Sequence, residues 1–251
     1  MTPVRPLALI TGGARRVGRA ICLELANAGC DIHFTHLNSR ADAVQVCAAL
    51  ELLGVRATTS LLDLDDPAAV ERFTLEFIAR HPRLDVLVHS AAIYESSGTT
   101  GVTADAVLRH YRINALAPLL LTARLGAILA ESQLPGGGSV IAFSDIHSLG
   151  RPRKQHAAYS MSKAALTEMV QTLAIELAPR VRVNAIAPGV IAFPETGPES
   201  DPDIQARYLK RVPLARSGTP EDAAKAVRWL ALEANYITGE IIRLDGGRWL
   251  A

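Results

Sequence analysis

The stretch Thr11-Gly12-Gly13-Ala14-Arg15-Arg16-Val17-Gly18 decides the fold, because it joins a short apolar run to a helical pattern. Residues 7–10 predict a strand, and residues 17–28 repeat apolar side chains at helical spacing. Gly12 lets the chain turn sharply out of the strand, and Gly18 lets the helix pack close to the sheet. The free N–H groups and positive dipole at this helix end attract a pyrophosphate. The stretch therefore predicts a dinucleotide-binding loop, with a plain strand-to-helix turn as the alternative.

The same alternation of apolar runs and helical patterns continues along the chain. Further strands are predicted at residues 31–36, 55–62, 84–89, 140–143, 181–187 and 240–244. Helices are predicted between them at residues 41–53, 67–81, 103–130 and 159–177, with a last helix from Pro220. Alternating strands and helices form parallel βαβ units. We therefore expect one α/β domain over residues 1–251, a doubly wound parallel sheet of the Rossmann type with helices on both faces and a substrate loop at about 189–219.

Composition excludes several classes of protein. The 251 residues carry 26 Lys+Arg and 25 Asp+Glu, a net charge of +1 that disfavours a nucleic-acid partner. The hydrophobic share of 49% excludes disorder as the dominant state. Cys22, Cys30 and Cys47 lack metal-ligand spacing, so we expect reduced thiols and no metal. Polar and helix-breaking residues interrupt the most apolar stretch, 116–130, and the apolar run at the start is too short for a signal peptide. We expect a cytoplasmic protein without a membrane span.

The end of the second predicted strand indicates which dinucleotide is bound. Residues 33–40 contain no acid, whereas enzymes that select NAD usually carry one there to hold the ribose hydroxyls. Arg15, Arg16 and Arg40 instead bring positive charge to the expected position of a 2′-phosphate. NADPH is therefore predicted over NADH. Asp63, just past the third strand, is expected to face the adenine or to cap the next helix.

The run Tyr159-Ser-Met-Ser-Lys163 places a phenol and an ammonium on one face of a helix. A tyrosine with its usual pKa near 10 is a poor acid–base group, and a lysine one turn away favours the phenolate. An ordinary surface pair is the alternative. Asn114 lies in a long helical region and is expected to support a proton-relay water. Ser144 and Asp145 end a predicted strand on the ligand-binding edge.

Together these motifs resemble the short-chain dehydrogenase/reductase superfamily. The Thr-Gly loop, Asn114, Tyr159 with Lys163, Pro188-Gly189 and Leu244-Asp-Gly-Gly247 carry the resemblance, which covers nearly the whole chain. It implies that the tyrosine transfers a proton and that the lysine lowers the tyrosine pKa and holds the nicotinamide ribose. It also implies an asparagine relay, a substrate anchor at position 144 or 145, and a homotetramer built on the long helices.

On this basis we expect a defined set of cofactor contacts. They are Thr11, Gly12, Arg15, Arg16, Val17, His36, Asn38, Ser39, Arg40, Asp63, His89, Ser90, Ala91, Tyr159, Lys163, Pro188 and Gly189. Of these, His89 is expected to be a spacer beside the adenosine. His147 and His156 are expected to be loop residues without a chemical role.

Three departures from the general pattern resemble the pteridine reductases and the bacterial dihydromonapterin reductases. Arg16 stands where most members have a glycine, His89-Ser90-Ala91-Ala92 where most have Asn-Asn-Ala-Gly, and Asp145 where most have serine. In those proteins the arginine touches both the cofactor phosphates and the pterin. An aromatic past the fourth strand stacks on the pterin ring, and Tyr94 stands there, with a loop aromatic covering the site as the alternative. The resemblance implies a substrate site of Arg16, Tyr94, Asp145 and Tyr159.

This set of side chains suits a nitrogen heterocycle. A carboxyl group accepts hydrogen bonds from ring N–H groups or lends a proton to a ring nitrogen, and a flat aromatic stacks on a flat ring. Asp145 lies one residue farther from Tyr159 than the usual spacing, so the loop 146–158 must absorb an insertion. Otherwise Ser144 or Ser148 is the anchor.

The predicted function is hydride transfer from NADPH to a dihydropterin of the dihydromonapterin, dihydrobiopterin or dihydrofolate type. The alternative enzyme is a carbonyl reductase such as a 3-oxoacyl-carrier-protein reductase, which would use Ser144. A non-catalytic NADPH-binding sensor is the alternative from another class, and the presence of Asn114, Tyr159 and Lys163 weighs against it.

Overall fold

The computed structural model describes residues 5–193 and 200–251. Within these residues, all the strands form one parallel sheet of seven strands in the order β3-β2-β1-β4-β5-β6-β7. The strands are β1 (Leu7–Thr11), β2 (Asp31–His36), β3 (Ala57–Leu61), β4 (Val86–His89), β5 (Gly138–Phe143), β6 (Val181–Pro188) and β7 (Ile241–Leu244). The predicted fold is confirmed. The order of the strands reverses between β1 and β4, which is where ligands of such sheets bind.

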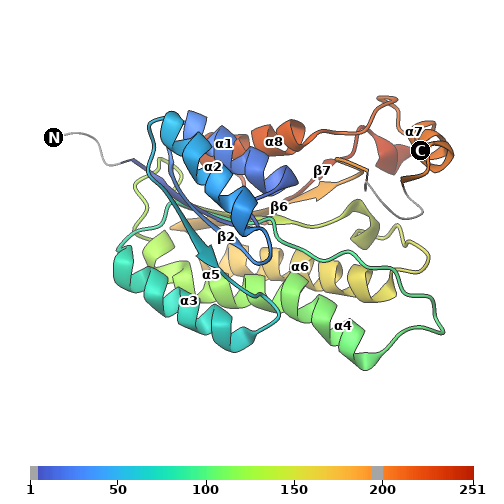
Figure 1. The fold of residues 1–251 in the computed structure, drawn as a ribbon, viewed down its shortest axis with the longest axis horizontal. Coiled ribbons are helices and arrows are strands. Elements are labelled where there is room, and N and C mark those ends of the chain that lie inside the picture. Colours follow the sequence, from blue (N-terminus) through green and yellow to red (C-terminus); the bar gives the residue numbers. More distant parts are fainter. Residues whose placement is uncertain (1–4, 194–199) are drawn as a thin grey trace.

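Helices cover both faces of the sheet (Figure 1). They are α1 (Arg16–Asn27), α2 (Arg40–Leu52), α3 (Pro67–Arg80), α4 (Ala104–Tyr111), α5 (Ala117–Leu129), α6 (Ala157–Glu176), α7 (Pro202–Leu209) and α8 (Pro220–Leu232). Helices α1, α2 and α8 pack on one face in one apolar cluster, and α3, α5 and α6 pack on the other. Central strands such as β5 are therefore buried along their whole length, which explains why they are apolar runs without alternation.

The helix predicted over residues 103–130 is observed as α4 and α5, joined by a π-helical turn at Arg112–Leu116. The combined stretch Ala104–Leu129 is long and apolar enough to cross a membrane by length and composition alone. Its apolar residues Leu121 and Leu125 are fully buried against the sheet, so its composition is that of a core helix. The π turn contains Asn114, and such turns occur frequently at functional sites.

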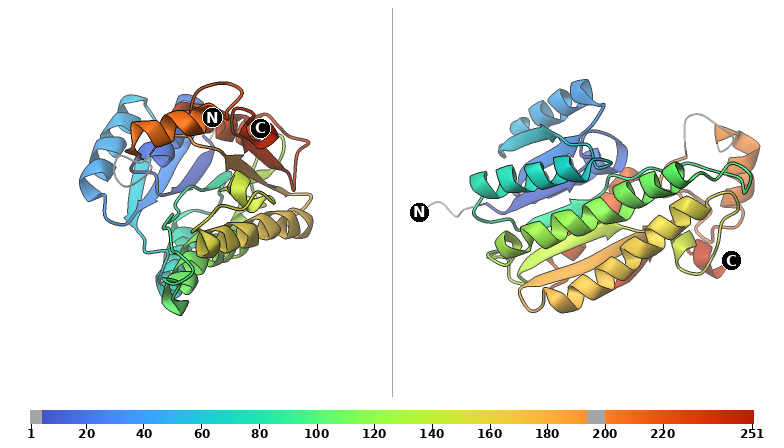
Figure 2. Two further views of the ribbon diagram at one scale, coloured as in Figure 1. Left: turned by 90° about the vertical axis from the view of Figure 1, so that its right-hand side faces the viewer. Right: turned by 90° about the horizontal axis from the view of Figure 1, so that it is seen from below.

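The expected substrate loop, residues 189–219, contains the helix α7. Asp201 begins this helix by accepting hydrogen bonds from the backbone N–H groups of Asp203 and Ile204. Residues 194–199 of the expected loop lie outside the described residues. The segment with α7 lies at the same end of the molecule as the C-terminus (Figure 2).

Candidate active site

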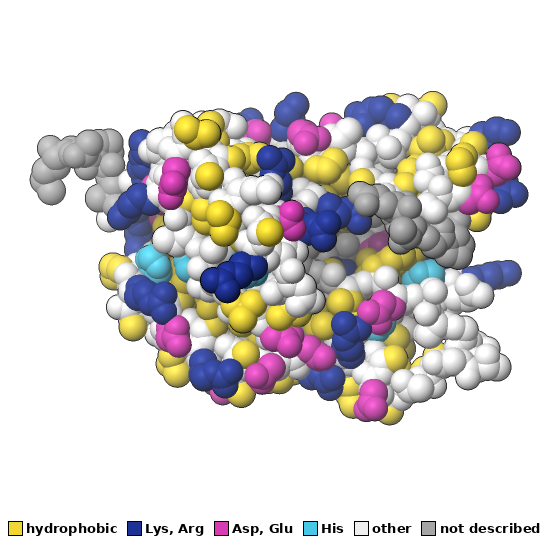
Figure 3. All heavy atoms as spheres, in the orientation of Figure 1, with side chains coloured by type: hydrophobic (Ala, Val, Ile, Leu, Met, Phe, Trp, Pro, Cys, Tyr) yellow, Lys and Arg dark blue, Asp and Glu magenta, His cyan; other side chains and the backbone are white. Residues whose placement is uncertain are grey.

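A cavity of about 730 Å³ lies at the carboxyl ends of the strands. Figure 3 shows a hollow near the middle of this face of the molecule, with basic side chains on its rim. Most of the residues predicted from the sequence line this cavity. They are Gly12, Arg15, Arg16, Val17, His36, Asn38, Ser39, Asp63, Ser90, Ala91, Tyr94, Asp145, Tyr159, Pro188 and Gly189. The fold therefore brings the predicted cofactor and substrate residues into one continuous space.

Five predicted residues lie outside the cavity wall: Thr11, Arg40, His89, Asn114 and Lys163. Thr11 accepts hydrogen bonds through Oγ1 from the backbone N–H groups of Ser90 and Ala91, so it holds the wall in place. Arg40 is the exposed first residue of α2, and the structure does not bring it to the cavity.

His89 also differs from the expectation that it lies beside the adenosine. Its ring is buried behind the wall, 2.8 Å from Thr122 Oγ1, and burial lowers its pKa to about 3. A buried histidine of this kind is a neutral core residue, because the charged form would lose its hydration. His89 packs beneath the site and does not line it.

The phosphate loop depends on close backbone approaches. Gly12 has φ +70°, and a Cβ there would lie 3.0 Å from Ala91 Cβ, while a Cβ on Gly18 would lie 2.1 Å from the Gly12 carbonyl oxygen. Arg16 has φ +48°, a left-handed conformation in which residues other than glycine are uncommon. Glycine adopts this conformation readily, which explains why most members of the resembled superfamily have a glycine at the position of Arg16.

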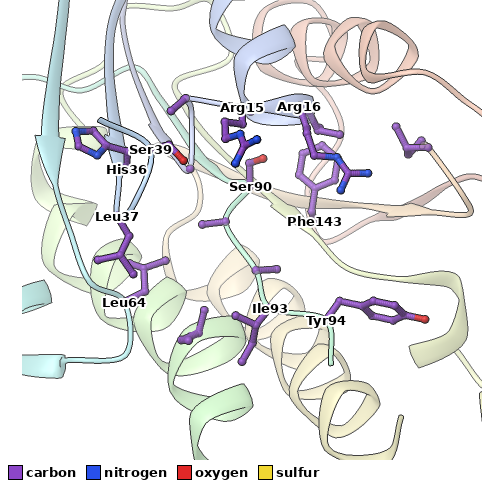
Figure 4. A pocket seen from close by; sticks show the side chains of 18 of the residues that line it. Arg15, Arg16, His36, Leu37, Ser39, Leu64, Ser90, Ile93, Tyr94 and Phe143 are labelled. Carbon is purple, nitrogen blue, oxygen red and sulfur yellow. The ribbon is translucent and has the colours of Figure 1, made fainter. Parts of the chain in front are cut away.

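The loop arginines extend from the loop into the cavity region (Figure 4). Arg16 Nη2 donates a hydrogen bond of 3.2 Å to the Ala192 carbonyl, which connects the phosphate loop with the segment after β6. Arg15 Nε lies 3.4 Å from Asp42 Oδ2, in an exposed pair. Two guanidinium groups beside a glycine-lined helix N-terminus fit the phosphates of a dinucleotide.

Tyr159 and Asp145 form the chemical centre of the site. The Tyr159 hydroxyl donates a hydrogen bond of 2.8 Å to Asp145 Oδ2. The other carboxylate oxygen accepts a 2.7 Å hydrogen bond from His147 N, where Asp145 caps the short 3₁₀ helix Ile146–Ser148. This helix and the left-handed Gln155, with φ +65°, lie in the segment between the two residues. The carboxylate therefore reaches the phenol in spite of the longer spacing.

The alternative anchor, Ser144, does not line the cavity. Its hydroxyl lies 2.7 Å from Thr167 Oγ1 and 3.2 Å from Ser148 Oγ, and the residue is buried. Of the three residues considered from the sequence, the structure brings the Asp145 side chain to Tyr159.

From the sequence we expected Lys163 to lower the pKa of Tyr159, but in the structure this pKa is raised. Burial and the Asp145 carboxylate raise the pKa of Tyr159 well above its usual value. Lys163 donates a 2.6 Å hydrogen bond to the Phe143 carbonyl, and burial lowers its own pKa to about 8. The reason for the difference is that the phenol contacts an anion directly, whereas the ammonium binds a backbone oxygen. At neutral pH the phenol therefore holds its proton.

Asn114 lies in the π-helical turn, and its side chain forms hydrogen bonds with two other segments of the chain. Its Nδ2 donates hydrogen bonds of 3.0 Å to the Ile93 carbonyl and to Ser162 Oγ. Its Oδ1 accepts a 2.9 Å hydrogen bond from Ile93 N. The carboxamide thus joins α6, which carries Tyr159, to the chain that follows β4. The relay water expected near Asn114 stays a prediction.

Tyr94 belongs to a group of aromatic side chains. Figure 4 shows it on the side of the cavity away from His36 and Ser39. Its ring stacks on His156, with centroids 4.6 Å apart and planes 18° apart. It meets the Tyr159 ring edge to face at 4.8 Å. As expected from the sequence, His156 lies outside the helix and directly precedes α6. Its ring also packs against an aromatic residue of the cavity wall, which was not expected.

Several residues of the wall were not predicted: Leu37, Leu62, Leu64, Ile93, Arg109, Ile113, Phe143 and Arg153. Val190, Ile191, Ala192 and Phe193 also line it and belong to the predicted substrate loop 189–219. Leu37 and Leu64 both line the cavity on the side of His36 (Figure 4) and offer it apolar surface. Many of these residues directly follow the ends of β2, β3 and β6. Counting a few residues past each predicted strand would have found them.

Comparisons with known proteins agree with this arrangement. The family model described as Enoyl-(Acyl carrier protein) reductase matches residues 12–248. An uncharacterised oxidoreductase of Methylorubrum extorquens is 32% identical, with 96% of each chain covered. The human dehydrogenase/reductase SDR family member 4 is 33% identical over 96% of this chain and 86% of its own length. The 3-oxoacyl-[acyl-carrier-protein] reductase of Staphylococcus aureus is 30% identical, with 97% and 98% covered.

Solved structures show the same fold over the whole chain. An acetoin dehydrogenase from Salmonella typhimurium has a TM-score of 0.87 and 30% identity over 99% of this chain and 97% of its own. A blue fluorescent protein from a metagenomic library, in complex with NADPH, has a TM-score of 0.86 and 31% identity, with 97% of each chain covered. The chain belongs to the short-chain dehydrogenase/reductase superfamily and is an oxidoreductase whose fold binds a nicotinamide cofactor.

Proposed function

We propose that this protein is an NADPH-dependent reductase that transfers hydride to a C=N bond of a dihydropterin. The pairing of the Tyr159 hydroxyl with the Asp145 carboxylate in the cavity wall, at 2.8 Å, carries the proposal. A carboxylate accepts hydrogen bonds from the ring N–H and amino groups of a pterin, which a serine hydroxyl does less well. A carbonyl substrate offers no such donors, so it gains little from an acid at this position.

The residues of this chain would divide the chemistry between them. When bound, the cofactor supplies the hydride. Arg15 and Arg16 would hold its phosphates, and Lys163 with Tyr159 would hold the nicotinamide ribose. Tyr159 keeps its proton at the hydroxyl, because its pKa is raised. Hydride addition to a C=N bond leaves a strongly basic nitrogen, which can take that proton. Asp145 orients that hydroxyl and accepts a hydrogen bond from the heterocycle.

The preference for NADPH is supported by charge at the adenosine end of the cavity. The residues that line it directly after β2 are Leu37, Asn38 and Ser39, none of which is acidic. Arg15 stands across from them on the phosphate loop (Figure 4). A guanidinium group binds a phosphate by two parallel hydrogen bonds, and none of the three residues after β2 would repel that phosphate. Arg15 also lies in an exposed pair with Asp42.

Arg16 and Tyr94 are proposed as the other substrate contacts. Arg16 already donates a hydrogen bond to the Ala192 carbonyl, so it connects the phosphate loop with the first residues of the segment 189–219. Tyr94 lies on the cavity wall against Tyr159 and offers stacking for a flat ring. We propose that residues 189–219 cover the substrate as part of a single domain of residues 1–251.

The test is NADPH consumption with three substrates side by side: dihydromonapterin, dihydrobiopterin and an acetoacetyl thioester. Reduction of a dihydropterin, inhibited competitively by a diaminopteridine antifolate, is the expected result. Asp145→Ala should then lower kcat/KM by about 5- to 150-fold, because a buried polar ring loses a hydrogen bond worth ~1–3 kcal/mol. Ser144→Ala is the matched control and should change little. Turnover of the thioester alone would refute the pterin assignment.

A carbonyl reductase is the second candidate, favoured by the 30% identity with the Staphylococcus aureus 3-oxoacyl-[acyl-carrier-protein] reductase. This candidate reverses the mutational result. Ser144→Ala would be the damaging change, Asp145→Ala would be mild, and the thioester would be the preferred substrate.

We also propose a cytoplasmic homotetramer. Exposed apolar side chains on α4, α5 and α6, including Leu108, Leu119 and Met161, offer a surface for helix packing between copies. Light scattering of the purified protein should give four times the 26.8 kDa chain mass. A monomer at micromolar concentration would refute the tetramer.

A further inference from the structure

We infer that His156 is a positioning residue that holds the Tyr94 ring against the catalytic tyrosine, so that substrate contacts at Tyr94 depend on His156. The inference concerns the reductase site itself and does not need the substrate to be a pterin. His156 is not part of the cavity wall, and its ring lies 4.6 Å from Tyr94 but 6.5 Å from Tyr159, measured between centroids. Its effect would pass through Tyr94.

The stack between the two rings is close and nearly parallel. The centroids lie 4.6 Å apart and the planes are 18° apart, so His156 covers one face of Tyr94. The Tyr94 ring also meets Tyr159 edge to face at 4.8 Å. Tyr94 is 42% exposed, whereas His156 is only 7% exposed. The Arg153 guanidinium also lies over the Tyr94 ring, 5.5 Å from its centroid, but His156 is the more buried and more closely stacked of the two side chains.

The His156 ring is held in turn by its own neighbours. Its Nδ1 lies 2.8 Å from the Lys154 carbonyl oxygen, which fixes Nδ1 as the protonated nitrogen and sets the ring orientation. Its backbone carbonyl accepts a 2.8 Å hydrogen bond from Ser160 N at the start of α6. The helix that carries Tyr159 therefore begins directly on the residue that supports Tyr94.

The backbones of the two segments are joined as well. Ser97 and His156 form an isolated parallel bridge, and Ser97 N donates a 2.6 Å hydrogen bond to the Gln155 carbonyl. Gln155 adopts φ +65° where this contact forms, a conformation that only surrounding structure maintains. The segment after β4 and the segment before α6 are thus joined twice, by these backbone contacts and by the stacked rings of Tyr94 and His156.

The experiment is a double-mutant cycle of His156→Ala and Tyr94→Ala, measured with dihydrobiopterin. If the wild type reduces only the acetoacetyl thioester, the cycle is measured with that substrate. The inference about His156 can then be tested even though the pterin assignment has failed. His156→Ala should raise the substrate KM about 2- to 12-fold, the range expected for one aromatic pair, with kcat and the KM for NADPH nearly unchanged. Adding Tyr94→Ala to His156→Ala should cost nothing further.

Two controls keep the result specific. His156→Phe should restore the KM, because phenylalanine stacks without the imidazole nitrogens. His81→Ala removes a histidine that also lies against an aromatic ring, 4.5 Å from Phe77, but at the amino end of the sheet, and should leave all kinetic constants unchanged. Multiplicative effects of the two alanine variants would overturn the inference. So would a failure of His156→Phe to rescue, or a fall in kcat and NADPH affinity without a change in substrate KM.

Discussion

At the scale of single residues, we expect turnover to depend on the hydroxyl of Tyr159. It is buried in the cavity wall and donates a hydrogen bond to Asp145. Tyr159→Phe should therefore lower kcat by about 10²- to 10⁴-fold while the Kd for NADPH changes little. Steady-state turnover and fluorescence titration of NADPH measure the two effects separately. Near-normal turnover would show that another group supplies the proton.

The neighbouring carboxylate should control the pH range over which that phenol stays protonated. The Asp145 charge and its hydrogen bond raise the pKa of Tyr159, in addition to burial. Asp145→Asn removes the negative charge, so the pKa of Tyr159 should fall. The alkaline limb of the kcat profile for reduction, where the phenol loses its proton, should then move to lower pH. An alkaline limb at the same pH as in the wild type, or at a higher pH, would contradict this assignment.

At the scale of elements, the loop between β1 and α1 should determine cofactor choice through its side chains. Arg15→Ala removes one charge-assisted phosphate contact, worth ~1.5–3 kcal/mol, and should raise the KM for NADPH about 10- to 150-fold. The KM for NADH should rise much less, because NADH lacks the 2′-phosphate. Arg19→Ala, an exposed arginine of α1 outside the cavity wall, is the matched control. Equal turnover of both cofactors by the wild type would refute the predicted preference.

The pairing of β2 with β3 makes stability depend on pH through His33. Its ring nitrogens lie 2.9 Å from Thr58 Oγ1 and 3.1 Å from Ser60 Oγ, and burial lowers its pKa to about 4. Because the unfolded chain, with a pKa near 6.5, binds the proton more readily, the stabilisation is complete above pH 6.5 and falls as the pH drops towards 4. The full loss is about 3 kcal/mol. Urea unfolding of wild type and His33→Gln at pH 7, 6 and 5 tests this: the variant should show the shallower decline, and parallel curves would exclude His33.

At the scale of the whole molecule, the cavity joins both halves of the sheet. Its wall includes Ser39 and Asp63 beyond β2 and β3, and Gly189 beyond β6. A dinucleotide bound there should stabilise the entire fold, by about 2.7 kcal/mol at a concentration 100 times its Kd. For a chain of this size the Tm should rise by about 5–11 °C. Thermal unfolding with equal concentrations of NADPH and NADH should show the larger rise with NADPH, and equal shifts would argue against selectivity.

The sequence alone determined the features that depend on local spacing. Period and run length predicted the seven strands, and the glycine stretch from Gly12 to Gly18 located the phosphate loop, because a strand followed by a tight turn and a helix is encoded within a few residues. Tyr159 and Lys163 are predictable for the same reason, since one helical turn separates them. Strand ends differed from the prediction by only a few residues, as at β3, where the predicted 55–62 is observed as Ala57–Leu61.

Tertiary structure alone decided the features that depend on distances between remote segments. Asp145 and Ser144 are neighbours in the chain, yet only the packing of α6 against β6 and against the 3₁₀ helix Ile146–Ser148 turns one towards Tyr159 and the other towards Thr167. The raised pKa of Tyr159 follows from that contact and from burial, neither of which a motif reveals. The stack of His156 on Tyr94 likewise joins two loops that meet only after the sheet has formed. Such contacts arise from packing between elements, which the local sequence pattern does not specify.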